Sequence, residues 1–254
     1  MIKLLVFDKD GVILDLAQTW LPVVRAVADY TISRIPPAAA DQITAGELLA
    51  SIGVDERTGQ IDPAGVFAKD SFFAIQSIWQ ALLPAEMFDL AADATYKAEV
   101  DELVLKLVHG RSIPKGDIKT PLGTLHAAGF HLALLTNDSE RSAQQNLDDM
   151  GVGQFFAPVV GADSGHGTKP TPEGLLFCCA EHGVAPTEAI MIGDTSADYG
   201  AAIAAGVADF ICIADDLDLL PNPAIKPESV IAELTALPDL LLRRGDTLLG
   251  PGSS

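Results

Sequence analysis

Short apolar runs alternate with helix-like stretches along most of this chain, and each run stops at polar residues or glycine. The runs are 2–7, 131–136, 189–192 and 209–213, with a weaker one at 156–160. Strands that are apolar on both faces indicate a parallel sheet that is covered on both sides. The stretches between them predict helices at 119–128, 139–150, 172–183, 197–205 and 228–243. This alternation predicts an α/β fold with a doubly wound parallel sheet.

One long segment breaks the alternation. Residues 16–112 contain helical patterns at 19–34, 66–82 and 86–108, and no convincing strand. Because they follow the first strand directly, we expect a smaller all-helical domain inserted into the core. The predicted domains are a core formed by 1–15 and 113–254 and a helical domain at 16–112. The C-terminal segment 243–254 is expected to be frayed.

The chain carries a strong negative charge. It has 16 basic and 35 acidic side chains among 254 residues, which gives 16 − 35 = −19. Such a surface repels nucleic acid and anionic membranes, so we expect neither as a partner. It also repels phosphorylated molecules, so a site for one of them needs local positive charge. The sequence does not indicate an oligomeric state.

The sequence contains no pattern of a signal peptide, a membrane span or a disulfide framework. The first apolar run is short and meets charge at once, and no run approaches the ~18 residues of a membrane span. The three cysteines are an odd set with two adjacent members, and we expect Cys178 and Cys179 to be core thiols. The histidines lack the HxH and HExxH spacings of zinc sites. These features favour a cytoplasmic protein.

Three of the predicted strands end in side chains that can bind a metal ion or phosphate. They are Asp8 and Asp10 after the first strand, Thr136 and Asn137 at the second, and Asp194 and Asp198 after the strand at 189–192. In a parallel sheet the carboxyl ends of the strands open on a common crevice. Carboxylates that converge there repel one another unless a hard divalent cation with oxygen ligands lies between them. Mg²⁺ is the expected cofactor.

Asp8 and Asp10 are two residues apart, so in an extended chain their side chains point the same way. One carboxylate can then attack phosphorus as a nucleophile. The other can donate a proton to the leaving oxygen and later take one from water. Gly11 permits the tight turn that follows.

A phosphoryl group also needs hydrogen-bond donors and positive charge. Thr136 offers a hydroxyl, and Asn137 offers its backbone and amide N–H groups. Lys169 lies in a glycine-rich loop, and the proline that follows it favours an extended backbone. That conformation suits a side chain that reaches into a site.

Four segments in order resemble the four motifs of the haloacid dehalogenase superfamily. They are FDKDGV at 7–12, LLTN at 134–137, TKPTPE at 168–173 and IGDTSAD at 192–198. The resemblance covers about 1–15 and 113–245, and it is greatest to phosphoglycolate-phosphatase-like members, which carry a helical cap after the first motif. It implies a Rossmann-like core with 16–112 as the cap. Val12 stands where many members have threonine, and Gly193–Asp194 stands where others have two adjacent acids.

The resemblance also implies a role for each motif residue. Asp8 would form an aspartyl-phosphate, and Asp10 would be the general acid and base and would bind Mg²⁺ through its backbone carbonyl. Thr136 and Asn137 would hold the phosphoryl oxygens, Lys169 would neutralise charge, and Asp194 would bind the metal directly. Asp198 would orient Lys169 or a metal-bound water. Because Asp10 is retained, unlike in the dehalogenases, the resemblance implies phosphate-ester chemistry on small phosphorylated metabolites.

Two other functions remain open. A phosphomutase of the beta-phosphoglucomutase kind shares these motifs and differs in what accepts the phosphoryl group. A receiver-like binding module also combines acidic residues with Thr and Lys, but it is much shorter and lacks an Asp10 equivalent. Arg57, Lys69 and Arg111 are candidates for holding a distal anionic group of the substrate. His166 lies near Lys169 in sequence and is a candidate for touching the substrate. Trp20 and Trp79 are expected in the core of the inserted segment.

Overall fold

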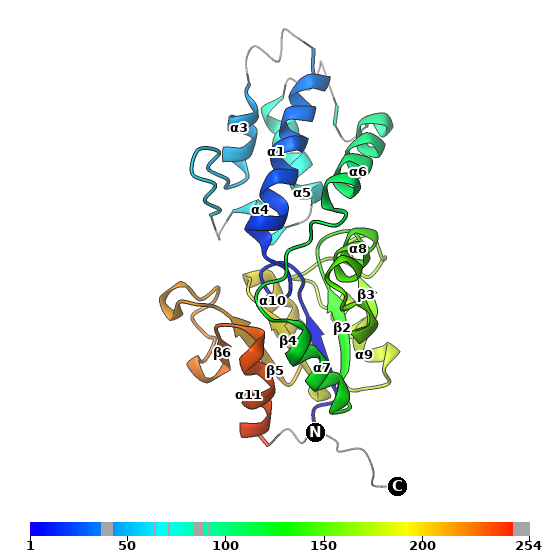
Figure 1. Cartoon of the computed structure of the whole chain (residues 1–254), viewed down its shortest axis with the longest axis vertical. Coiled ribbons are helices and arrows are strands. Elements are labelled where there is room, and N and C mark those ends of the chain that lie inside the picture. The colour runs from blue at the N-terminus through cyan, green and yellow to red at the C-terminus, as the bar shows by residue number, and fades with distance from the viewer. Residues whose placement is uncertain (37–42, 63–64, 71, 84–88, 91, 246–254) are drawn as a thin grey trace. The chain divides into compact units, whose positions relative to one another are not determined.

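The computed structural model describes residues 1–36, 43–62, 65–70, 72–83, 89–90 and 92–245 (Figure 1). The chain divides into two units, one formed by residues 1–15 and 112–245 and one by Leu16–Arg111. The division falls where the first predicted strand leads into the helical segment and where the chain returns from it. Among the described helices, none combines the length and the apolar character that a bilayer crossing needs.

The larger unit is built on a parallel sheet. Within the described residues it has six strands in the order β3-β2-β1-β4-β5-β6. Their bounds are β1 Leu4–Phe7, β2 His131–Leu135, β3 Phe156–Val160, β4 Ala189–Gly193, β5 Asp209–Ile213 and β6 Val230–Ile231. The predicted doubly wound sheet is therefore confirmed. The strand order reverses between β1 and β4, which is where such sheets place their binding crevice.

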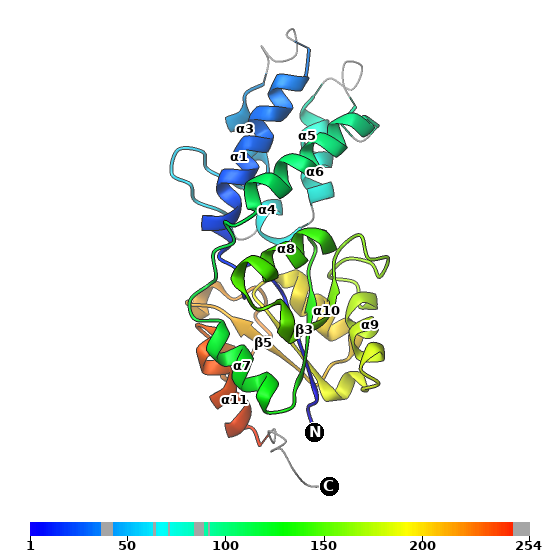
Figure 2. The same cartoon turned by 45° about the vertical axis from the view of Figure 1, so that its right-hand side comes forward.

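Helices cover both faces of this sheet. They are α7 Lys119–Ala127, α8 Glu140–Met150, α9 Glu173–Glu181, α10 Ser196–Ala205 and α11 Leu237–Arg243. Figure 2 shows the sheet between α7 and α11 on one side and α9 and α10 on the other. On the latter side, alternate residues of β1, Leu4 and Val6, pack with Cys178 and Cys179 in one buried cluster. The expectation that these cysteines are core thiols is confirmed.

The predicted last helix, 228–243, is wrong in its first half. Val230 and Ile231 form β6 and pair with Cys212 and Ile213 of β5. Two adjacent β-branched residues favour a strand, and they find an edge to extend. The helix α11 begins only at Leu237, with a proline in its first turn, where the missing N–H costs nothing.

The expected frayed segment begins later than Arg243. Arg243 ends α11, and the guanidinium of Arg244 donates to Asp209, to the Glu228 carbonyl at 2.9 Å and to Ser229 Oγ at 2.8 Å. These bonds hold Arg244 against the start of β5. The rest of the predicted frayed segment, 246–254, lies outside the described residues.

The smaller unit is helical in its described part. Its helices are α1 Leu16–Arg34, α3 Ala45–Ser51, α4 Val66–Lys69, α5 Phe72–Leu82 and α6 Ala94–Val108. The predicted helix 66–82 is two helices, because α4 ends at Lys69 and Asp70 after it is extended. The predicted helix 86–108 begins only at Ala94 as α6. The Asp93 carboxylate caps it by accepting from Thr95 N and Tyr96 N. Part of the predicted start, 86–88 and 91, lies outside the described residues.

Of the two tryptophans that the sequence predicts in the core of this unit, Trp79 lies in it and Trp20 packs against it. Trp79 is fully buried, and its Nε1 donates to the Leu48 carbonyl at 2.9 Å. Trp20 packs partly buried against the same cluster. The helix α3, which supplies Leu48, was not predicted. It is started by a capping box in which Thr44 and Glu47 bond each other's backbone N–H.

Candidate active site

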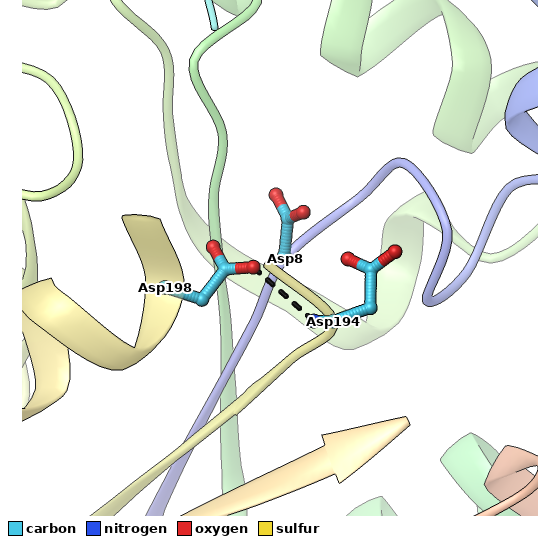
Figure 3. Close-up of side chains that lie close together, drawn as sticks. All are labelled: Asp8, Asp194 and Asp198. Atoms are coloured by element: carbon cyan, nitrogen blue, oxygen red, sulfur yellow. Dashed lines mark hydrogen bonds between the residues drawn. The ribbon is translucent and has the colours of Figure 1, made fainter. Parts of the chain in front are cut away.

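Three carboxylates from different elements meet at the carboxyl end of the sheet. Asp8 follows β1, Asp194 follows β4, and Asp198 lies in the first turn of α10. Each contributes an oxygen atom, and these atoms all lie within 4.8 Å of one another (Figure 3). β1 and β4 are neighbours in register, so their ends deliver Asp8 and Asp194 side by side. The site therefore lies at the point where the strand order reverses.

Lys169 lies between two of these carboxylates, those of Asp8 and Asp198. Its ammonium Nζ donates to Asp8 Oδ1 at 2.5 Å and to Asp198 Oδ1 at 2.6 Å, and the side chain is 4% exposed. The other oxygen of Asp198 accepts from Thr195 N, Thr195 Oγ1 and Asp194 N at 2.9, 2.7 and 3.2 Å. Both Asp198 oxygens are thus engaged, one by the lysine and one by the loop after β4.

Burial makes the ionised form of these carboxylates costly. It raises the pKa of Asp8 from its ordinary 3.8 to about 7, and the charge of Asp198 adds to this against the opposing effect of Lys169. Burial, then the charges of Asp198 and Asp8, raise the pKa of Asp194 well above its usual range. Burial lowers the pKa of Lys169, but the charges of Asp198 and Asp8 outweigh it and raise that pKa. Additional positive charge at this site would be favourable.

The residues fit a hard divalent cation. The Oδ1 atom of Asp194 is buried and has no hydrogen-bond partner among the described residues. A buried carboxylate oxygen without a partner costs free energy, and a cation would remove that cost. Because the Asp198 oxygens already accept bonds, Asp194 and Asp8 are the carboxylates that could hold the ion. Oxygen ligands of this kind suit Mg²⁺.

Gly11 shapes the same site. Its φ of +76° lies in the left-handed region, and a Cβ built there would stand 1.9 Å from Asp194 Oδ2. Only glycine allows the turn after Asp10 to approach the Asp194 carboxylate so closely. The backbone carbonyl of Gly11 accepts from Lys115 Nζ at 2.6 Å. Lys115 also lowers the pKa of Asp194, although burial and the neighbouring acids dominate.

Asp10 does not join the three-carboxylate cluster through its side chain. Its Oδ2 lies 2.8 Å from the Nζ atom of Lys9, which is fully buried. The i, i+2 spacing therefore does not place the Asp10 carboxylate beside that of Asp8, because the chain bends at Lys9 between them. Lys9 Nζ also donates to Asp138 Oδ2 and Asn146 Oδ1, both at 3.0 Å.

Thr136 and Asn137 lie at the end of β2 and are both buried. Thr136 Oγ1 accepts from Asp138 N at 3.2 Å, so its own proton can be directed at a phosphoryl oxygen. The Asn137 amide has a second task that the sequence did not indicate. Its Nδ2 donates to Lys169 O at 3.0 Å and its Oδ1 accepts from Lys169 N at 2.8 Å. Asn137 therefore holds the backbone of Lys169.

Comparison with known proteins decides the family. Residues 2–206 match the family described as haloacid dehalogenase-like hydrolase. The chain belongs to this family. A phosphoglycolate phosphatase of Vibrio vulnificus is 31% identical over 241 residues, which is 95% of this chain and 96% of that one. The resemblance seen in the four motifs and the expectation of an enzyme, a phosphatase, are thereby confirmed.

Solved structures of the family share the fold. A structure described as a predicted phosphoglycolate phosphatase from Haemophilus somnus has a TM-score of 0.69 at 18% identity, covering 94% of this chain and 97% of that one. A putative beta-phosphoglucomutase from Thermotoga maritima has a TM-score of 0.62 at 19% identity, covering 95% and 99%. Since structures described as either kind share this fold, the fold does not separate hydrolase from mutase.

The remaining candidate residues have other contacts or belong to the helical unit. His166 stacks on Phe177 with ring centroids 3.7 Å apart. Arg57 lines a cavity in the helical unit with Gln60 and Asp62, among others. Arg111 is exposed at the end of that unit, and the side chain of Lys69 lies outside the described part of the chain.

Sequence reasoning missed Lys9 and Lys115. Lys9 carries no local signal, because the chain bends there and its ammonium group meets oxygens of Asp138 and Asn146 far along the chain. Lys115 carries none either. It comes near Gly11 because residues 13–15 and 113–115 pair with each other, through bonds such as Lys115 N to Ile13 O at 2.9 Å.

Proposed function

We propose that this protein is a Mg²⁺-dependent phosphatase of small phosphorylated metabolites that acts through an aspartyl-phosphate on Asp8. One observation carries the proposal: the buried Asp8 carboxylate lies 2.5 Å from the Lys169 ammonium and beside Asp194, which has a buried oxygen with no partner among the described residues. A carboxylate held between a fixed cation and a metal site is arranged to attack an anionic phosphoryl group.

Each residue then has a defined part. Asp8 forms a bond to phosphorus while the bond to the leaving oxygen breaks, and Asp10 gives that oxygen a proton. Water next attacks the phosphorus of the aspartyl-phosphate while the bond between phosphorus and Asp8 breaks. Asp10 takes up a proton from the water, the Asp8 carboxylate is restored, and inorganic phosphate leaves. Lys169 neutralises charge, and the Thr136 hydroxyl and the Asn137 backbone N–H hold phosphoryl oxygens.

Asp194 and Asp8, together with the Asp10 carbonyl, would hold Mg²⁺. When bound, the ion supplies positive charge at the phosphoryl group. The Asp198 carboxylate orients Lys169 through the bond of 2.6 Å. We propose residues 16–112 as a cap, because a helical unit interrupts the core at this place in the chain. We propose phosphoglycolate or sugar phosphates as the substrate class, and the relative from Vibrio vulnificus, a phosphoglycolate phosphatase, supports the first of these.

The test is an assay of phosphorylated metabolites with Mg²⁺ and with EDTA. We expect inorganic phosphate to be released from at least one monophosphate with Mg²⁺ and without any bisphosphate activator, and release to stop with EDTA. Negligible phosphate release across the panel, combined with rapid isomerisation of a sugar phosphate, would show a mutase instead. Full turnover in EDTA would refute the metal dependence.

A further inference from the structure

Lys9 is a buried cation with a complete set of acceptors. Its side chain is 0% exposed, and its Nζ lies 2.8 Å from Asp10 Oδ2 and 3.0 Å from both Asp138 Oδ2 and Asn146 Oδ1. An ammonium group has three N–H donors, and burying one is costly unless they are satisfied. Three oxygens from three side chains meet this requirement. The position of Lys9 is therefore well determined.

The backbone of Lys9 closes the turn that carries Asp10. Its carbonyl accepts from Ile13 N and from Leu14 N, both at 2.9 Å, and Gly11 N donates to Leu14 O at 2.8 Å. The same residue thus fixes the turn through its backbone and the Asp10 carboxylate through its side chain.

The other two partners of Lys9 are Asp138 and Asn146. Asn146 is fully buried in α8, and its Nδ2 donates to Ser112 Oγ at 2.9 Å. Asp138, just before α8, donates its backbone N–H to Thr136 Oγ1 at 3.2 Å. Lys9 therefore connects Asp10 to a hydrogen-bonded framework that also holds a phosphoryl-binding residue.

We propose that Lys9 is a positioning residue for the proton-transfer step of Asp10. This proposal rests on the proposed function, in which Asp10 protonates the leaving oxygen and later deprotonates water. Lys9 holds the Asp10 carboxylate through Oδ2. A proton passes from this carboxylate to the leaving oxygen as the phosphorus–oxygen bond breaks, and the carboxylate recovers a proton from the attacking water. The Lys9 contact fixes the orientation in which the carboxylate carries out both transfers.

Lys9→Met tests this, because methionine has a similar length and no charge. A misplaced acid harms an ester whose leaving group needs protonation. We expect kcat/KM to fall ~10²-fold more for 2-phosphoglycolate, an alkyl ester, than for 4-nitrophenyl phosphate, whose leaving group departs without a proton. A purely structural role would lower both values by the same factor, and that result would overturn the proposal.

Two further variants keep the test decisive. Lys9→Met leaves Asp138 without its cation, whereas Lys9→Met/Asp138→Asn removes one charge of each sign. If the single variant does not fold, the double variant replaces it in the test, and we expect the ~10²-fold selectivity between the two esters from it. Lys3→Met is the matched control, since Lys3 is 46% exposed and pairs with Glu188 at 2.6 Å. It should leave both esters unaffected.

The reference variant is Asp10→Asn. If it shows the ester selectivity and adding Lys9→Met to it changes the selectivity no further, Lys9 acts through Asp10. If Asp10→Asn is selective and the Lys9 variants are not, the positioning proposal alone fails. If Asp10→Asn lowers both esters equally, the acid–base role in the proposed function fails, and the Lys9 proposal fails with it.

Discussion

Gly11→Ala should weaken metal binding far more than it weakens the fold. The new Cβ would stand 1.9 Å from Asp194 Oδ2, whereas ordinary contact begins near 3.4 Å, so the carboxylate must move by about 3.4 − 1.9 = 1.5 Å. A displacement of about 1 Å at a site can cost ~10²-fold in rate. We expect kcat/KM to fall ~10²-fold and the Mg²⁺ concentration for half-maximal activity to rise at least ~10-fold.

The chain offers a matched control in Gly183→Ala. Gly183 has a φ of +62°, close to the +76° of Gly11, but nothing lies within 4 Å of its added Cβ. Both variants lose about 1–2 kcal/mol by forcing alanine into the left-handed region, which is a fall in Tm of about 2–8 °C. Only the Gly11 variant also displaces Asp194. Equal Mg²⁺ titrations for the two variants would refute the reasoning.

Three further outcomes follow from the site. Asp194→Asn should raise the Mg²⁺ requirement at least ~10-fold, whereas Asp218→Asn, at an exposed position, should not; this is read from activity against Mg²⁺ concentration. Asn137→Ala should lower kcat by releasing the Lys169 backbone and cost about 1–3 kcal/mol in chemical denaturation, and an unchanged kcat would contradict this. Because burial raises the pKa of Asp8 to about 7, the stability gained from its proton is complete below pH 3.8 and is lost as the pH rises through 7. Mg²⁺ competes with that proton, so the rise in Tm caused by Mg²⁺ should be larger at pH 8 than at pH 5; an equal rise would count against a metal on Asp8.

Much of the fold could be predicted because its strands are apolar on both faces. Such runs, as at 2–7 and 189–192, have few alternatives to a buried parallel strand. β6 was missed because two residues carry no periodicity, and their conformation depends on pairing with Cys212 and Ile213. α3 was missed because the signal is a capping box rather than a long apolar pattern.

The sequence predicts which strand ends supply the residues of the site. It does not predict which partners each side chain bonds. Strand ends place Asp8 and Asp194 together whatever their rotamers. The direction of the Asp10 carboxylate depends on Lys9, and the task of the Asn137 amide depends on where the loop of Lys169 lies. The Asn137–Lys169 contact spans 32 residues, and the Lys9–Asp10 contact joins neighbours at a bend of the chain, so no regular spacing encodes either.

The central claim is that Asp8 carries the phosphoryl group. Its most direct test is rapid acid quench during turnover, followed by proteolysis and mass spectrometry of the peptides. We expect a phosphoryl group on the peptide that contains Asp8, and none in Asp8→Asn, in which the charge is lost while size and shape are kept. Phosphate on a different residue, or an Asp8→Asn enzyme that turns over at a near-normal rate, would contradict the claim.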